Sequence, residues 1–140
     1  MSTPFRSPTI QQFLAGKDVV ILTTLQKNGA PLAMPMWFVA DVDGLSMISV
    51  ADTQKVRNLR RDGRVCVVAE SGTRGAEIRG VSIQGHVVFL EEVLAYQPVV
   101  TRLLQKYDPH LANLWGGTTK PLNRVVFRVV PEKVYGWGLD

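Results

Sequence analysis

Residues 45–70, LSMISVADTQKVRNLRRDGRVCVVAE, contain a predicted strand, a short helix and a second strand in close succession. The β-branched and apolar residues at the two ends of this stretch predict strands over 45–50 and 64–70. Between them a helix is predicted over 53–62, and Gly63 is the residue expected to end it. The stretch therefore indicates a chain in which one basic helix separates two strands.

Further strand signals lie on both sides of this stretch. They cover residues 19–25, 31–40, 79–90 and 124–130, and residues 134–137 are expected to extend the last of them. An Asn-Gly and an Asp-Gly turn join the first three strands of the chain, which predicts an antiparallel meander. Pro35 indicates an edge, a bulge or a ligand-facing break, and Gly85 indicates a bulge or a sharp bend. Six strands with few helices predict a mainly β fold, a small barrel or sandwich.

Two more helices are predicted outside the sheet. A short amphipathic helix is expected over 9–15, and a second helix is expected to run from Pro98, in its first turn, to Tyr107. Residues 71–78 and 108–121 contain no clear periodicity and are predicted to be loops. With 140 residues and no linker, the chain is expected to form one domain, 1–140.

Composition excludes several classes of protein. Apolar residues make up 46% of the chain and charged residues 20%, which is unlike a disordered chain. The single cysteine, Cys66, rules out an internal disulfide and favours a reducing compartment. No stretch approaches the roughly 20 apolar residues of a membrane span, and the first residues do not resemble a secretory signal. A cytoplasmic protein without a membrane partner is therefore expected. One cysteine and two separate histidines also predict that no metal is bound.

The positive charge of the chain is local. Residues 55–64 carry five basic side chains and one acidic one, which accounts for the whole net charge of +4. A strand end leads here into a helix N-terminus, where free backbone N–H groups favour an anion. The hydroxyls of Ser49 and Thr53 and the side chains of Lys55 and Asn58 lie close to that end in the sequence. They predict a phosphate site, with a solvated helix face as the alternative.

Nucleic acid is a less suitable anion for this segment. Sites for single strands usually combine basic and aromatic side chains, and residues 55–64 contain no aromatic residue. Motifs of serine hydrolases and of phosphate-binding glycine-rich loops are also missing from the sequence. The residues therefore point to a small-molecule ligand and identify no catalytic side chain.

Several motifs resemble those of the pyridoxamine-phosphate-oxidase-like split-barrel proteins, and more narrowly of their deazaflavin (coenzyme F420)-dependent branch. The segment Lys55–Val65 resembles the family pattern K-x-x-N-[LI]-R-R-D-x-R-V. Pro35–Phe38 is similar to the family, and Arg79–Gly85 fits its pattern R-x-V-x-[VI]-x-G. The resemblance covers about residues 9–137. Some deazaflavin-binding members carry an arginine where this chain has Thr53, and Met34–Trp37 is apolar where oxidases that use FMN carry basic residues.

The resemblance implies a six-stranded antiparallel split barrel that forms a homodimer with a cofactor between the subunits. It implies hydride transfer from reduced coenzyme F420 to an unsaturated small molecule. The alternatives are an oxidoreductase that binds FMN and a non-catalytic protein that binds a flavin or heme. The implied cofactor-binding residues are Met34, Pro35, Met36 and Trp37 at the ring, and Ser49, Val50, Thr53, Lys55, Arg57 and Asn58 around the phosphate. Trp115 or Trp137 is expected either to shape the substrate face or to pack in the core.

Overall fold

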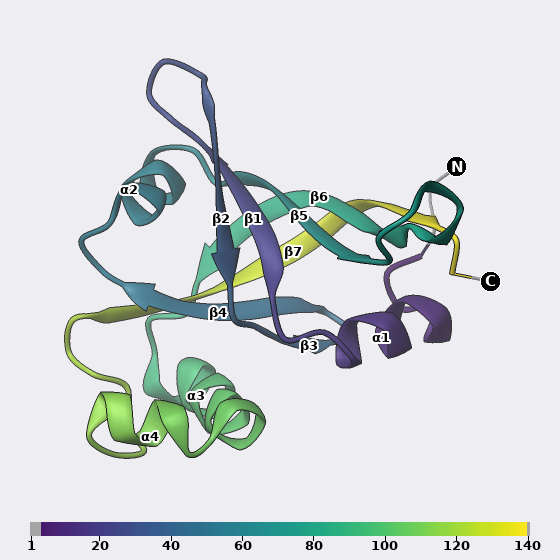
Figure 1. Cartoon of the computed structure of the whole chain (residues 1–140). Coiled ribbons are helices and arrows are strands. Elements are labelled where there is room, and N and C mark those ends of the chain that lie inside the picture. The colour runs from purple at the N-terminus through teal and green to yellow at the C-terminus, as the bar shows by residue number, and fades with distance from the viewer. Residues whose placement is uncertain (1–3, 140) are drawn as a thin grey trace.

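The structure, a computed structural model, describes residues 4–139 and is built around one seven-stranded antiparallel sheet (Figure 1). Its strands are β1 Val20–Leu25, β2 Pro31–Met36, β3 Val39–Asp41, β4 Gly44–Val50, β5 Arg64–Ser71, β6 Arg79–Phe89 and β7 Arg124–Trp137. Its helices are α1 Pro8–Ala15, α2 Gln54–Arg61, α3 Val93–Tyr107 and α4 His110–Trp115, with the short 3-10 helix Gly75–Glu77 between β5 and β6. The order β2-β1-β5-β6-β7-β4-β3 curls into a split barrel.

The two edges of this sheet are consecutive in the chain. β2 pairs with β1 at one edge and β3 pairs with β4 at the other, and only Trp37 and Phe38 separate them. The predicted strand 31–40 is therefore broken in two, which raises the strand count from the expected six to seven. Its first part, β2, pairs antiparallel with β1, and its second part, β3, pairs antiparallel with β4, as the predicted meander requires. Pro35 lies in the edge segment β2, where a missing N–H donor is tolerated.

Side chains from alternate strand positions fill the inside of the barrel. The largest fully buried ones include Phe38, Leu22, Leu45, Met47, Ile83 and Phe127. Ile10 and Leu14 of α1 belong to the same core. Burial of such side chains stabilises a fold by about 1.5–3 kcal/mol each. This core therefore fixes the barrel on which the site is built.

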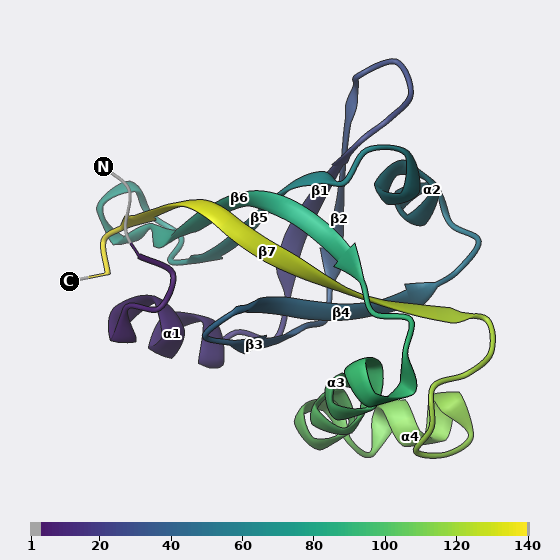
Figure 2. The same ribbon diagram turned by 180° about the vertical axis from the view of Figure 1, so that it is seen from behind.

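A second, smaller core lies between the sheet and the helices α3 and α4. Val99, Val100, Leu103, Leu104 and Tyr107 are buried on the side of α3 that the sequence predicts to be apolar. Figures 1 and 2 show α3 and α4 together below β4, with α1 beside the end of β3. The two helices consequently form a wall beside the last residues of β4.

Gly85 lies at a β-bulge, as expected. The pairing between β6 and β7 shifts register between Gln84 and Gly85. A β-carbon at Gly85 would lie 2.1 Å from the carbonyl oxygen of Val130, so only glycine allows the two strands to approach this closely. The bulge bends the long strand pair, and Figure 2 shows β6 and β7 curving together over the barrel.

Three predictions about helices need correction. α3 begins at Val93, where Glu92 accepts the backbone N–H groups that follow, so Pro98 lies inside the helix and not in its first turn. The predicted loop 108–121 contains α4, which ends at Gly116 in a left-handed conformation with φ 71°. The predicted loop 71–78 contains a single 3-10 turn. None of the helices in the described part of the chain is long and apolar enough to cross a membrane.

The basic helix α2 forms where the sequence predicts it. Val56 and Leu59 are buried against the barrel, and Asp62 follows the last helical residue. Thr53 occupies the N-cap position, but its hydroxyl donates to the carbonyl oxygen of Val50 at 3.2 Å and does not cap the helix. The link between β4 and α2 is thus held by a turn, which fixes the direction in which α2 leaves the sheet.

Candidate cofactor site

A cavity of about 420 Å³ lies where the sheet is broken. The end of β2, the end of β4, α2, α3, α4 and the first residue of β7 all contribute to its wall. Six of the ten predicted cofactor-binding residues line it, namely Pro35, Met36, Trp37, Ser49, Val50 and Lys55. Leu103, Leu111, Leu114 and Trp115 complete an apolar side. The cavity is therefore apolar along β2 and the helices, and cationic at α2.

The other four predicted residues lie outside the wall of this cavity. Met34 is 38% exposed on β2, and Arg57 forms an ion pair with Asp52 at 2.7 Å. The hydroxyl of Thr53 is engaged in its turn, as described above. Asn58 faces the barrel and not the cavity. The structure thus brings the strand-end residues and Lys55 together but separates them from most of α2.

Asn58 is a buried link between α2 and β1. Its side-chain amide donates to Oγ1 of Thr24 at 3.0 Å, and its Oδ1 accepts from Nε2 of Gln54 at 2.8 Å. Both Asn58 and Thr24 are fully buried. These partners already satisfy the polar atoms that the sequence assigns to a phosphate. The visible role of Asn58 is to hold α2 in place, which in turn positions Lys55.

Trp37 forms a fixed aromatic surface at the break between β2 and β3. Its ring stacks on that of Tyr107, with centroids 4.5 Å apart and planes 9° from parallel. The Tyr107 hydroxyl donates to the carbonyl oxygen of Asp18 at 2.7 Å and accepts from the backbone N–H of Phe38 at 3.1 Å. Burial raises the pKa of Tyr107, which keeps this hydroxyl protonated. Trp37 remains 40% exposed and offers an anchored apolar face to a flat ring.

Two cations line the cavity without an acidic partner. Lys55 is half-buried, and this burial lowers the pKa of its ammonium group from the usual 10.5. Arg124 is half-buried too, and its guanidinium donates to Oδ1 of Asn123 at 2.7 Å. Among residues 4–139, neither side chain has a carboxylate within ion-pair distance. Arg124 is the site residue that sequence reasoning missed, because it is far from Lys55 in the chain.

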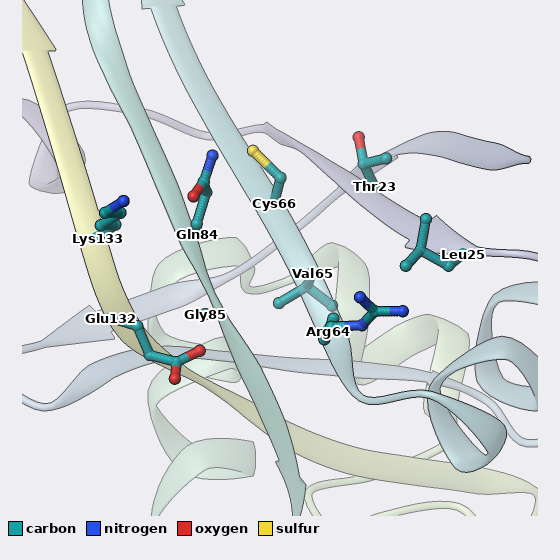
Figure 3. A pocket seen from close by; sticks show the side chains of 9 residues that line it. All are labelled: Thr23, Leu25, Arg64, Val65, Cys66, Gln84, Gly85, Glu132 and Lys133. Atoms are coloured by element: carbon teal, nitrogen blue, oxygen red, sulfur yellow. The ribbon is translucent and has the colours of Figure 1, made fainter. Parts of the chain in front are cut away.

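A second cavity, of about 450 Å³, lies on the outer face of the sheet (Figure 3). Its wall includes one row of paired positions across four strands, namely Thr23 on β1, Cys66 on β5, Gln84 on β6 and Lys133 on β7. Cys66 is half-buried, with its Sγ 3.5 Å from Oγ of Ser82. Among the described residues, its wall is largely polar and charged and contains no aromatic side chain.

The described part of the chain contains no group of three histidine, cysteine or carboxylate side chains able to hold a metal ion.

Trp115 lines the first cavity, so the expectation of a substrate-facing tryptophan fits its place. Trp137 lies at the end of β7 and lines neither of the two cavities described above.

Comparison with known proteins identifies the family. The sequence model of pyridoxamine 5'-phosphate oxidase matches residues 7–138. The chain belongs to the pyridoxamine 5'-phosphate oxidase family. This match confirms the family that the motifs in the sequence predict, and the split barrel confirms the predicted fold. The comparison with curated proteins gave no match.

Several solved structures have a similar fold. A conserved hypothetical protein of Mycobacterium tuberculosis is 27% identical over 93% of this chain and 82% of its own, with a TM-score of 0.79. The heme storage protein of Vibrio cholerae is 17% identical over 94% of each chain, with a TM-score of 0.77. An F420 reductase is 21% identical over 89% of this chain and 94% of its own, with a TM-score of 0.65. At the identities of the last two, the likeness concerns the fold alone.

Proposed function

We propose that this protein is an oxidoreductase that binds coenzyme F420 and transfers a hydride to an unsaturated small molecule. The observation that carries the proposal is the cavity at the break in the sheet. It joins an anchored aromatic face, Trp37, to a half-buried cation without an acidic partner, Lys55. A flavin-type cofactor has the complementary form, with a flat ring at one end and a phosphate at the other.

The residues of the cavity fit the two parts of such a cofactor. Pro35, Met36 and Trp37 would support the ring, since apolar side chains form one continuous side of the cavity. Lys55 would hold the phosphate, with the buried Ser49 nearby in the wall, its hydroxyl donating to the carbonyl oxygen of Val50 at 3.3 Å. Desolvation strengthens the attraction between a cation and an anion, so a half-buried ammonium is well suited to this role.

The chain contributes binding and orientation to the reaction. A reduced deazaflavin, when bound, supplies the hydride. The stacked pair Trp37 and Tyr107 would fix the orientation of the ring, and the apolar residues of α3 and α4 would exclude water from the substrate. Within the described part of the chain, no histidine and no carboxylate lines the cavity, which agrees with chemistry that the cofactor carries.

Among the alternatives, FMN has the same two parts, a flat ring and a phosphate, and differs from the deazaflavin in both the ring and the tail, so the same cavity residues would suit it. Heme fits the residues less well, although the fold is shared with a heme storage protein. His86 lies on β6 beside Glu132, with 3.6 Å between Nδ1 and Oε1, and His110 begins α4. Neither histidine lines the cavity, so a heme bound there would lack the commonest axial ligand.

We further propose that the chain forms a homodimer in which the partner covers the open side of the cavity. Val19 lines the cavity and is 42% exposed, and Ile21 is 37% exposed on the outer face of β1 beside it. Burial of these side chains would stabilise a dimer. Sedimentation should show a dimer for the natural chain and a monomer for Ile21→Glu. A monomeric natural chain would refute this part of the proposal.

Parallel fluorescence titrations with coenzyme F420 and FMN test the cofactor. We expect tighter binding of the deazaflavin and weaker binding by Lys55→Met, by about 10- to 100-fold, the range for a hydrogen bond to a charged group. Lys133→Met is the matched control, because this lysine lines the outer cavity instead. Preferential binding of FMN would refute the deazaflavin as cofactor and favour a flavin. Equal affinity of Lys55→Met and Lys133→Met would refute the placement of the phosphate at Lys55.

Activity needs its own measurement. The oxidation of reduced coenzyme F420 should accelerate in the presence of the protein and an enone or a quinone, with Trp37→Ala slower than the natural chain. A protein that binds the cofactor but accelerates no such oxidation would be a carrier and not an enzyme.

A further inference from the structure

Arg124 occupies a defined position beside the proposed phosphate site. It is the first residue of β7 and stands directly opposite Val50, the last residue of β4. Side chains at opposite positions of antiparallel strands project to the same face, with β-carbons about 5 Å apart. Val50 lines the cavity and begins the turn that leads to α2. Arg124 therefore enters the cavity from β7 while Lys55 enters it from α2.

The other basic side chains around this region are already engaged. Arg60 forms an ion pair with Glu91 at 3.2 Å and lies 3.7 Å above the centroid of the Phe89 ring. Lys120 donates to the carbonyl oxygen of Arg124 at 2.9 Å. Arg124 donates only to a neutral amide and, unlike Arg60, has no carboxylate partner within the described residues; unlike Lys120, it lines the cavity. Two half-buried cations in one cavity repel each other, and an anion between them removes this cost.

We infer that Arg124 is a binding residue that holds the cofactor phosphate together with Lys55. The inference rests on the proposed function and adds to it a second cation from another element. Every phosphate ester, monoester or diester, has at least two non-bridging oxygens. The planar guanidinium of Arg124 can engage them with two parallel N–H donors, while the ammonium of Lys55 acts as a point charge. The cavity thus recognises a phosphate from two walls, which sets the position of the attached ring.

The test compares Arg124→Gln with Arg128→Gln, Arg124→Lys and the natural chain. Arg128 is the matched control, because it lies on β7 opposite Ser46 and outside the wall of the cavity. Fluorescence titrations use coenzyme F420, FMN and riboflavin, which has the ring of FMN without the phosphate. We expect Arg124→Gln to weaken binding of the two phosphorylated cofactors by about 10- to 100-fold, with riboflavin affinity and the circular dichroism spectrum unchanged. Arg124→Lys should restore part of the affinity, and Arg128→Gln should behave like the natural chain.

The outcomes separate this inference from the proposed function. Binding of a phosphorylated cofactor that is equal in Arg124→Gln and the natural chain would overturn the inference alone. An equal loss of riboflavin and FMN binding would also overturn it, because the arginine would then act on the ring or on folding. If neither cofactor binds, the proposed function fails, and inorganic pyrophosphate becomes the probe. A rise in melting temperature with pyrophosphate that Arg124→Gln lacks would support the phosphate site, and the absence of such a difference would overturn it.

Discussion

Replacement of Asn58 by alanine should destabilise the fold without touching the cavity. Asn58 and Thr24 are fully buried and joined by a 3.0 Å hydrogen bond between α2 and β1. Loss of this bond costs about 1 kcal/mol, and the buried Thr24 hydroxyl left without its partner costs about 1–3 kcal/mol more. We therefore expect Asn58→Ala to lower the free energy of unfolding by about 2–4 kcal/mol. For a domain of this size that corresponds to a Tm lower by roughly 6–15 °C.

A double-mutant cycle isolates the link itself. Thr24→Val keeps the shape of the threonine and removes its hydroxyl, so the cost of Asn58→Ala should be smaller in that background by about 1–2 kcal/mol. Urea unfolding followed by circular dichroism measures all four proteins at one protein concentration, since a dimer makes stability depend on concentration. A coupling energy near zero, or a loss below about 1 kcal/mol for Asn58→Ala alone, would refute the reasoning. So would a weaker affinity for FMN at full stability, because it would place Asn58 on the phosphate.

Three further outcomes are expected. Tyr107→Phe removes the hydroxyl that accepts from the N–H of Phe38 and should lower stability by about 1–3 kcal/mol, measured by urea unfolding; an unchanged midpoint would contradict this. Gly85→Ala places a β-carbon 2.1 Å from the carbonyl oxygen of Val130 and should lower stability by more than about 2 kcal/mol, and a stable, soluble variant would show that the bulge can move. Hydrogen bonds from the arginine two residues later hold the pKa of Asp62 at about 2, below its ordinary 3.8. The stability that Asp62 and Arg64 add together is therefore present above about pH 3.8 and is lost as the pH falls towards 2. Asp62→Asn should abolish this pH dependence. An NMR titration that gives the Asp62 carboxyl a pKa of 3.8 would contradict the prediction.

Local patterns suffice for most of the sheet and for α2. Alternating apolar residues define strands such as β5. Gly85, inside a long strand pattern, correctly indicates the bulge in β6. Pro35 indicates an edge, a bulge or a break in the run 31–40, but nothing local places the break at Trp37 and Phe38, because the run stays apolar on both sides of them. Proline at position 98 favours a helix start, but tertiary packing of α3 overrides that preference.

The candidate site shows the same limit. Ser49, Val50 and Lys55 are close in the sequence, so reasoning about one strand end brings them together correctly. Arg124 belongs to the site only because β7 pairs with β4, a long-range contact that no local pattern reveals. Asn58 is three residues after Lys55 in the helix, so the sequence pattern groups the two. Its hydrogen-bond partner Thr24, which decides its role, lies on β1.

The break between β2 and β3 has a consequence for how sequences of this fold can change. Trp37 and Phe38 connect two ladders but belong to neither. A substitution at Trp37 therefore alters the lining of the cavity without removing a strand hydrogen bond, and its cost to stability comes from the lost stacking on Tyr107. Ligand preference can diverge at this position while the barrel persists. The same fold occurs in a heme storage protein and in an F420 reductase.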